Sequence, residues 1–323
     1  MNKIRYIRKR FHDMLQIYVG NDVCLYMKYL YFLDWLFAFL IQGASISDYF
    51  GYGFYKKRVN GRNEYITYRR FCKIQNICNK KEDRDLCMNK MKFNKYFRPT
   101  SVQEAIELLQ NNEDSKIVAG GTDVVIRLRA HMLKVDTLVD ISAIPELKEI
   151  KVDGDNLVIG AGYDLMSLSK NPLVKDSKWE IIAECAGHVS STQVRNRATL
   201  GGNNVNASPS ADTTPALLIS DAIVNIVGPN GKRDIPIDEF LLGPGKTALE
   251  KNEIVVSFTI PKPDDRCEAA YHKHAIRGDT DIAIVGVGVR IGLNDDDTIK
   301  MARVALGAVA PRSIRAKEVE EFL

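Results

Sequence analysis

The chain has 323 residues, with 45 Lys and Arg against 41 Asp and Glu, a net charge of +4 and a pI of about 8.6. Its 6 cysteines and 5 histidines lack the spacing of a disulfide framework or of a zinc or iron–sulfur site. We therefore expect reduced thiols, no protein-bound metal and a cytoplasmic location.

Residues 1–90 differ in composition from the rest of the chain. They carry 17 Lys and Arg against 8 Asp and Glu, ten of the 13 tyrosines and none of the 11 prolines. Residues 91–323 have a net charge of about −5, so the basic pI averages two unlike parts. We expect residues 1–90 to be a disordered or non-native extension, with Met91 as an alternative start of the chain.

A membrane anchor, a secretory signal and a nucleic-acid-binding arm are the alternatives for this extension. The apolar segment 23–41 is interrupted by Lys28 and Asp34, which are costly in hydrocarbon. The segment before it is too long for a secretory signal, and no clear small-residue cleavage site follows it. The scattered aromatic residues match no nucleic-acid-binding module. We therefore expect neither a membrane attachment nor a nucleic acid partner.

The body of the chain begins with helix and strand signals around a double glycine. A Ser-x-x-Glu capping box at 101–104 predicts a helix that runs to about Gln110. A short strand over 116–119 enters the glycine turn, and a helix over 124–132 and a strand over 137–140 follow it. This order predicts a small, mostly parallel sheet with the turn at the carboxyl end of a strand.

Hairpins and helices alternate in the next part of the chain, and strands fill most of the last part. The patterns predict strands over 149–152, 156–161, 222–227, 233–235, 254–260, 269–275, 282–291 and 300–308 and helices over 165–169, 179–187 and 213–219. A final helix starts at Arg315, and its apolar face at Val319, Phe322 and Leu323 has no later element to cover it. We therefore expect the C-terminal domain to be truncated.

Two double-glycine turns are the most informative feature of the body. The first comprises Ile117, Val118, Ala119, Gly120, Gly121, Thr122, Asp123 and Val124, and the second comprises Thr199, Leu200, Gly201, Gly202 and Asn203. Without Cβ atoms, such turns bring backbone N–H groups close to a ligand, and successive N–H groups form an anion site. Two such turns, each followed by a small polar residue, predict one diphosphate held from two sides.

Further motifs accompany these turns along the chain. They are Arg98-Pro99-Thr100-Ser101, Gln193-Val194-Arg195-Asn196, Ala207-Ser208-Pro209-Ser210-Ala211-Asp212, Gly243-Pro244-Gly245-Lys246-Thr247, Asp281-Ile282-Ala283 and Leu306-Gly307-Ala308-Val309-Ala310-Pro311. With both turns, they make residues 91–323 resemble the FAD-binding subunits of the molybdenum hydroxylases, which are the flavin chains of xanthine dehydrogenase, carbon monoxide dehydrogenase and their relatives. The resemblance does not extend into residues 1–90.

The resemblance implies an α+β fold, with a two-subdomain FAD-binding domain of the PCMH type over residues 91–266 and a truncated α+β domain over 267–323. It implies that both turns hold the FAD diphosphate, that Asp212 contacts the cofactor, and that Val255 and Lys273 lie near the flavin. The alternative role for Asp212 is to cap the helix that follows it. Neither turn contains a His or Cys for covalent attachment, so we expect noncovalent FAD.

The resemblance also implies an electron-transfer subunit. A molybdopterin-binding subunit and a 2Fe–2S subunit are the implied partners, and NAD or another acceptor receives the electrons from FAD. The alternatives are a stand-alone flavin-dependent oxidoreductase and a noncatalytic nucleotide-binding or membrane-tethered protein.

Other patterns have simpler explanations. The run 243–247 lacks the glycine that a P-loop needs five positions before its second glycine, where Phe240 stands. His272 and His274 share one face of a strand and are expected to be plain surface residues rather than partner contacts. Arg197 is either an anion ligand or a solvated residue, whereas we expect Arg195 to have a structural role beside the second turn.

Overall fold

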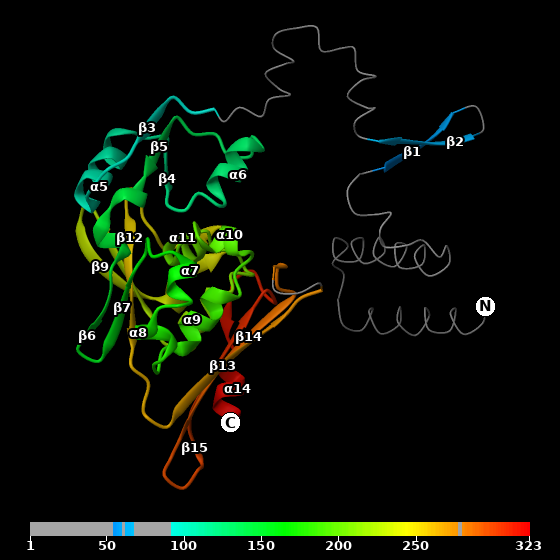
Figure 1. Ribbon diagram of the computed structural model, residues 1–323. Coiled ribbons are helices and arrows are strands. Elements are labelled where there is room, and N and C mark those ends of the chain that lie inside the picture. The colour runs from blue at the N-terminus through cyan, green and yellow to red at the C-terminus, as the bar shows by residue number, and fades with distance from the viewer. Residues whose placement is uncertain (1–53, 60–61, 68–91, 277–279) are drawn as a thin grey trace. The chain divides into compact units, whose positions relative to one another are not determined.

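The computed structural model describes residues 54–59, 62–67, 92–276 and 280–323 (Figure 1). The chain divides into two compact units, Met1–Arg84 and Asp85–Leu323. In the first unit, β1 (Phe54–Val59) and β2 (Arg62–Thr67) form an antiparallel hairpin that the sequence patterns do not predict. The rest of the predicted extension, including segment 23–41, lies outside the described residues.

The second unit starts with a small parallel sheet. Its strand order is β3 (Lys95–Phe97), β5 (Thr137–Asp140) and β4 (Ser115–Val118), and its connections contain α5 (Val102–Asn111) and α6 (Val124–Arg129). The predicted helix start is confirmed, because the Ser101 hydroxyl accepts from the Glu104 N–H, but the reciprocal bond of the capping box is shifted by one residue, since the Glu104 carboxylate accepts from the Thr100 N–H. The first glycine turn follows Val118 and therefore starts at the carboxyl edge of this sheet.

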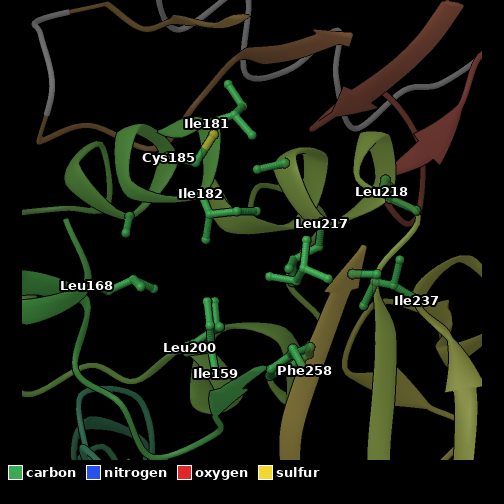
Figure 2. Close-up of a cluster of buried hydrophobic side chains, with 14 of the residues drawn as sticks. Ile159, Leu168, Ile181, Ile182, Cys185, Leu200, Leu217, Leu218, Ile237 and Phe258 are labelled. Carbon is green, nitrogen blue, oxygen red and sulfur yellow. The ribbon is translucent and has the colours of Figure 1, made fainter. Parts of the chain in front are cut away.

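An antiparallel sheet and a layer of short helices form the middle of this unit. The sheet order is β6 (Ile150–Asp153), β7 (Asn156–Gly160), β12 (Ile254–Pro261), β8 (Ile223–Gly228) and β9 (Gly231–Pro236). The helices are α7 (Leu165–Leu168), α8 (Pro172–Lys175), α9 (Glu180–Gly187), α10 (Thr192–Arg195), α11 (Leu200–Val205) and α12 (Thr213–Ile219). Side chains from both layers, such as Ile182, Leu200 and Phe258, are buried in one hydrophobic core (Figure 2). This core fixes α11, and with it the second glycine turn, against the sheet.

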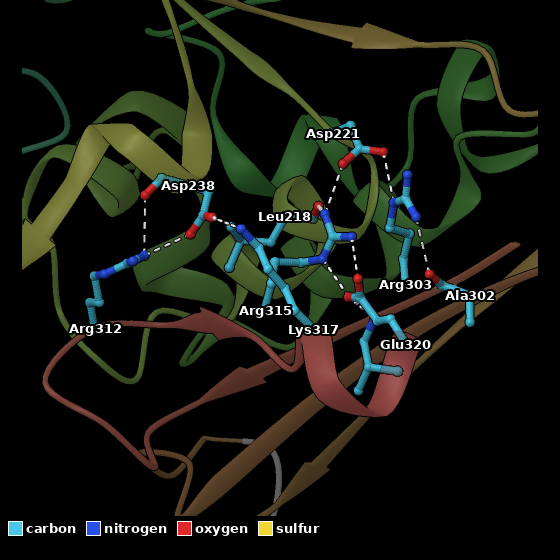
Figure 3. A network of polar contacts seen from close by, with 10 residues as sticks. Leu218, Asp221, Asp238, Ala302, Arg303, Arg312, Arg315, Lys317 and Glu320 are labelled. Atoms are coloured by element: carbon cyan, nitrogen blue, oxygen red, sulfur yellow. Dashed lines mark hydrogen bonds and ion pairs between the residues drawn. The ribbon is translucent and has the colours of Figure 1, made fainter. Parts of the chain in front are cut away.

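The last part of the unit is a second antiparallel sheet. Its order is β13 (Cys267–His274), β14 (Val285–Leu293), β15 (Ile299–Gly307) and β16 (Ile314–Arg315), and α14 (Lys317–Phe322) follows it. One face of the sheet packs on α12, where Gly288 lies against the side chains of Pro215 and Ile219. Arg315 forms ion pairs with Asp221 and with Glu320 of α14, which tie the sheet to the helical layer (Figure 3).

Most of the predicted elements, and the mixture of helices and sheets, are confirmed. Helix α6 is shorter than predicted because the chain turns after Arg129, with His131 at a φ of 54°. The strand predicted from residue 282 starts only at Val285. Several short elements are unpredicted because they are too short to produce a periodic pattern; they include α8, α10, α11, α13 (Ile237–Phe240), β10 (Leu241–Gly243) and β11 (Lys246–Thr247). In the described part of the chain, no helix combines the length and the apolar composition that a bilayer span requires.

Candidate functional site

The first glycine turn packs directly against the segment that leads into the second. A Cβ atom on Gly120 would lie 1.8 Å from the carbonyl oxygen of Arg197, so only glycine permits this approach. Gly121 has a φ of +78°, a conformation that side chains rarely adopt. The two turns are far apart in the sequence, and this contact makes them neighbours in the fold.

The backbone of the first turn has unused hydrogen-bond donors. In the described part of the second unit, no hydrogen bond is donated by the main-chain amides of Gly120, Gly121, Thr122 and Asp123. The first amide of this segment that does donate is that of Val125, to the Gly121 carbonyl at 3.0 Å. A run of unpaired N–H groups in a turn is a binding site for an anion.

The second double glycine does not form a loop turn as predicted, because Leu200, Gly201, Gly202 and Asn203 lie in the first turn of the helix α11 (Leu200–Val205). The backbone of this segment, for which we keep the name second turn, is bonded within the protein. The amides of Leu200, Gly201 and Asn203 donate to carbonyl oxygens at 3.1, 2.8 and 3.0 Å. The Thr199 hydroxyl caps α11 by accepting from the Gly202 N–H at 3.0 Å. The expectation that both turns present free amides therefore holds only for the first turn.

Buried polar side chains join the second turn to α12. Asn204, which is fully buried, donates to the Leu200 carbonyl at 2.9 Å and to the Thr213 hydroxyl at 3.0 Å. It accepts from the Thr214 hydroxyl at 3.0 Å. The Thr213 hydroxyl in turn donates to Oδ1 of Asn203 at 2.6 Å. Among the described residues, Nδ2 of Asn203 has no acceptor, so this amide is a side-chain donor at the second turn.

A cavity of about 280 Å³ lies beside the first turn. Its lining consists of Ala119, Gly120, Ile141, Ser142, Lys148, Gly162, Tyr163, Asp164, Ser167, Asn196, Arg197 and Thr199. Lys148 and Arg197 bring two positive charges to it, and neither forms an ion pair within the described residues. The one carboxylate, that of Asp164, is engaged in capping α7 through the Ser167 N–H at 2.8 Å. Of the four residues with free amides, Gly120 lines this cavity, where it meets the two cations, and the other three follow it in the chain. A free amide beside unpaired cations suits a phosphate-bearing ligand.

Lys148 is a site residue that no sequence motif indicates. It ends a 3₁₀ turn, Pro145–Lys148, which follows β5 after a few residues. The Gly162 N–H donates to the adjacent Leu147 carbonyl at 2.7 Å, which holds this turn beside the segment before α7. Its place at the carboxyl end of a parallel strand is the only signal that could have suggested a role.

Asp212 stands at the start of α12, but its side chain does not cap the helix. Its carboxylate accepts from the Tyr271 hydroxyl at 3.0 Å and from Nζ of Lys273 at 2.9 Å. The side chains of Asp212 and Lys273 are only 8 and 4% exposed. Burial raises the pKa of the Asp212 carboxyl, and the hydrogen bonds from Lys273 and Tyr271 oppose that rise. The capping alternative for this side chain is wrong, and two of the predicted cofactor residues form one buried ion pair.

The other residues that the sequence analysis singled out lie in the hydrophobic core, bond to backbone carbonyl groups or lie on an exposed strand face. Val255 of β12 and Leu200 of α11 are buried in the hydrophobic core. Arg195 donates to the carbonyl oxygens of Val189 and Ser190 at 3.0 and 2.7 Å, which confirms its structural role. His272 and His274 lie on the exposed face of β13, as predicted.

The run 243–247 forms a tight hairpin between β10 and β11, with Gly245 at a φ of 66°. The Gly245 N–H donates to the Ala207 carbonyl at 3.0 Å. A P-loop leads from a strand into a helix, whereas this run leads from one short strand into another. The rejection of a P-loop at this place is therefore confirmed.

Comparisons with known protein families agree with this arrangement. The family described as "FAD binding domain in molybdopterin dehydrogenase" matches residues 90–263. The family described as "CO dehydrogenase flavoprotein C-terminal domain" matches residues 269–323. The chain belongs to the FAD-binding subunits of the molybdenum hydroxylases. Its cofactor is FAD, and it is an oxidoreductase component.

Individual relatives and solved structures show the extent of the similarity. The xanthine dehydrogenase FAD-binding subunit of Escherichia coli O157:H7 is 36% identical over 231 residues, which are 71% of this chain and 78% of that protein. The carbon monoxide dehydrogenase medium chain of Hydrogenophaga pseudoflava is 36% identical over 222 residues, or 68% of this chain and 76% of that one. A crystallised carbon monoxide dehydrogenase from Hydrogenophaga pseudoflava superposes with a TM-score of 0.69 at 34% identity, over 72% of this chain and 81% of that one. Quinoline 2-oxidoreductase from Pseudomonas putida 86 superposes with a TM-score of 0.68 at 29% identity, over 72% of this chain and 80% of that one.

Proposed function

We propose that this subunit binds the diphosphate of FAD in the cavity beside the first glycine turn and serves as the flavin-dependent electron-transfer chain of a larger enzyme. The observation that carries the proposal is the position of Gly120, the first of four amides without an acceptor among the described residues, at a cavity that Lys148 and Arg197 also line. A diphosphate has acceptor oxygens for all of these donors and two negative charges for the cations. Two side-chain donors are proposed to extend the same site: the Thr122 hydroxyl at the first turn and the Asn203 side-chain amide at the second turn.

The chemistry of the donors also fits noncovalent attachment. The lining of the cavity includes no His and no Cys. Of the two described cysteines, Cys185 lies in the hydrophobic core, and burial raises the pKa of its thiol well above the usual range. A thiol that remains protonated is a poor nucleophile, so it does not form a bond to the flavin. Both described cysteines are unpaired, which is in line with the proposed cytoplasmic location.

The flavin end of the cofactor is proposed to lie towards Asp212, Lys273 and Val255. FAD supplies the exchange of electrons when it is bound. The ion pair between Asp212 and Lys273 keeps a fixed positive and a fixed negative group in a buried place, where their field acts more strongly than it does in water. The Tyr271 hydroxyl and the His188 carbonyl hold this pair in one orientation. In this proposal, these residues orient the flavin and polarise it through their charges. None of them has to move a proton for the subunit to transfer electrons.

We propose that partner chains carry the molybdopterin and 2Fe–2S groups and that electrons leave this subunit to NAD or another acceptor. Two similarities support this division of labour. The E. coli O157:H7 relative is named as a FAD-binding subunit, and the Hydrogenophaga pseudoflava relative is named as a medium chain. The solved structure from Hydrogenophaga pseudoflava is titled as a carbon monoxide dehydrogenase that lacks the Mo-pyranopterin moiety of its molybdenum cofactor, so the name of that enzyme includes such a cofactor.

The test begins with the cofactor. The full chain is produced in an expression host, purified and precipitated with acid, and the flavin in the supernatant is identified by chromatography and quantified against protein. We expect FAD in the supernatant at one equivalent and none in the pellet. FAD that stays in the pellet would contradict noncovalent binding, and a colourless protein that takes up no added FAD would contradict the site itself.

The second part of the test concerns the partners. The chain is tagged in its native host, and the proteins that copurify are identified together with their bound molybdenum and iron. We expect molybdenum and iron in the purified complex, with iron-dependent reduction of the flavin by substrate. A chain that purifies alone with FAD and reduces an acceptor by itself would show a stand-alone flavin-dependent oxidoreductase instead.

A further inference from the structure

Arg290 is a buried arginine on the inner face of β14. The other inner positions of this strand are Gly286, Gly288 and Gly292, so the guanidinium group is the only long side chain on that face. The residue is 4% exposed. Removing a charged group from water is unfavourable unless an opposite charge or a full set of hydrogen bonds replaces the water.

The protein supplies little of that compensation. Nη2 of Arg290 donates to the Ser220 hydroxyl at 2.9 Å, and Ser220 is itself buried. Among the described residues, Arg290 has no carboxylate within ion-pair distance. Burial lowers the pKa of Arg290. A guanidinium group remains charged even so, and its other nitrogen atoms, which are not fully enclosed, need acceptors from the solvent or from a ligand.

The nearby carboxylate of Asp221 is already used. Nε of Arg303 donates to one of its oxygens at 3.1 Å, and Nη1 of Arg315 donates to the other at 2.8 Å (Figure 3). Both oxygens of Asp221 are therefore engaged by these two arginines. One carboxylate shared between two guanidinium groups does not neutralise a third.

Arg290 also lines a cavity of about 230 Å³, which shares no lining residue with the cavity at the first turn. The polar residues of this lining are Ser220, Asp221, Lys262, Asp264, Cys267 and Arg290. Asp264 pairs with Lys300 at 2.7 Å, whereas Lys262 has no ion pair within the described residues. Both carboxylates of the lining, Asp221 and Asp264, are thus paired with cations outside it, whereas its own two cations, the buried Arg290 and the exposed Lys262, have no ion pair within the described residues.

We propose that this second cavity binds a small organic oxyanion, a carboxylate or a phosphate ester, on the guanidinium group of Arg290. Two parallel N–H donors of a guanidinium group match two oxygens of either group. Lys262 contributes a second, solvent-exposed charge, and the Ser220 hydroxyl, which lines the same cavity, accepts from Nη2 and holds the guanidinium group in place. The volume of the cavity leaves space for a small organic body attached to the anion. The site thus gives the subunit a ligand other than its flavin.

The test uses the full chain saturated with FAD, so that the first cavity is filled. Inorganic phosphate and acetate are titrated separately by isothermal calorimetry at constant ionic strength. We expect saturable binding of one equivalent, and phosphate-selective or acetate-selective binding distinguishes a phosphate ester from a carboxylate. We expect Arg290→Gln to weaken that binding by about tenfold or more. No saturable binding of either anion to the wild-type chain, or equal affinity in Arg290→Gln, would overturn the proposal.

A second pair of variants keeps the test independent of folding. Lys262→Gln and Lys232→Gln each remove one exposed charge, and only Lys262 lines the cavity. We expect Lys262→Gln to weaken anion binding by about threefold and Lys232→Gln to leave it unchanged. Equal effects of both substitutions would show binding by general surface charge and would refute the site.

Discussion

The two glycine turns have similar sequences but different physical roles. Within the part of the chain that the structure describes, the first leaves four successive amides without an acceptor next to a cavity, whereas the second uses its amides in bonds to the protein and in the cap of α11. Glycine is needed at both because another backbone segment comes close, the Arg197 carbonyl at Gly120 and the Ala161 carbonyl at Gly201. A double glycine therefore indicates close backbone packing, and only the bonding of its amides shows whether a ligand is served.

This difference assigns separate roles to the two halves of the proposed FAD site. The first turn, with Lys148 and Arg197, is built to meet an anion. The second turn is a rigid support that places Thr199 and Asn203, and the Asn204 network anchors it to α12. Substitutions in the first region should act mainly on FAD affinity, and those in the second mainly on stability.

The largest effect is expected at the contact that joins the two regions. In Gly120→Ala, the new Cβ atom would meet backbone rather than a side chain that could rotate away. We expect a loss of about 3 kcal/mol or more in the free energy of unfolding and a loss of bound FAD, both larger than in Asp212→Ala. Urea unfolding and flavin content are the measurements. Gly243→Ala is the matched control because no atom lies within 4 Å of its Cβ position, and a normal flavin content in Gly120→Ala would contradict the contact.

The next effect concerns the support of the second turn. Asn204→Ala removes three buried hydrogen bonds and leaves the groups that made them without partners. We expect a loss of about 2–4 kcal/mol in the free energy of unfolding of the FAD-free chain. Asn196→Ala, an exposed asparagine at the first cavity, is the control and should change stability little. Similar unfolding midpoints for the two variants would remove the distinction between the regions.

Replacing the threonine of each turn by valine compares the two turns directly. Thr199→Val removes the cap of α11 and should lower the stability of the FAD-free chain by about 1 kcal/mol. Thr122→Val removes a hydroxyl that has no partner in the described residues, so the stability should not change while FAD affinity falls about tenfold. Chemical unfolding without FAD and fluorescence titration with FAD measure the two quantities. The reverse pattern would mean that the roles of the turns are exchanged.

A smaller effect is expected from the two cations. Lys148→Gln and Arg197→Gln should each weaken FAD binding by about two- to fivefold, and both should reduce its dependence on salt concentration. Lys151→Gln, an exposed lysine of β6 outside the cavity lining, is the control. An unchanged salt dependence in all three variants would show that neither cation meets the diphosphate.

The sequence predicts the parts of this site that depend on local structure. The capping box at Ser101, the strand over 137–140 and the glycine turns are visible because each depends on neighbouring residues. The hydrogen bond from the Gly201 amide to the Ala161 carbonyl cannot be predicted from the sequence, because it depends on how α11 packs on the sheet. Lys148 was missed for the same reason, since it reaches the cavity only through the packing of the 3₁₀ turn that carries it.

Long-range pairing also explains the outcome at Asp212. Its position before a helix made capping the simplest alternative, yet a strand that starts more than fifty residues later brings Tyr271 and Lys273 to its carboxylate. A local rule fails where a distant partner binds the same oxygens more strongly. Arg290 is comparable, since the valines and isoleucine of its segment predict a strand but not the cavity beside it.

The smallest predicted effect is a pH dependence of opposite sign in the two regions. Asp140, at the end of β5 near the first turn, has a lowered pKa: burial would raise it, but hydrogen bonds from Ser142 and Tyr96 more than offset that. Asp212, beside the second turn, has a pKa raised by burial. Asp140 therefore contributes stability that is present above the ordinary value of 3.8 and is lost as pH falls through its lowered pKa. Asp212 contributes stability that is present below 3.8 and is lost as pH rises through its raised pKa.

Asparagine variants separate these two contributions. Asp140→Asn should flatten the fall in stability on the acid side of pH 3.8, and Asp212→Asn should flatten the fall on its alkaline side. Guanidinium unfolding of the FAD-free chain between acid and neutral pH measures both slopes against the wild type. If both variants flatten the pH dependence of stability on the same side of pH 3.8, the two carboxylates have the same environment. The contrast between an open first region and a buried second region then does not extend to their charges.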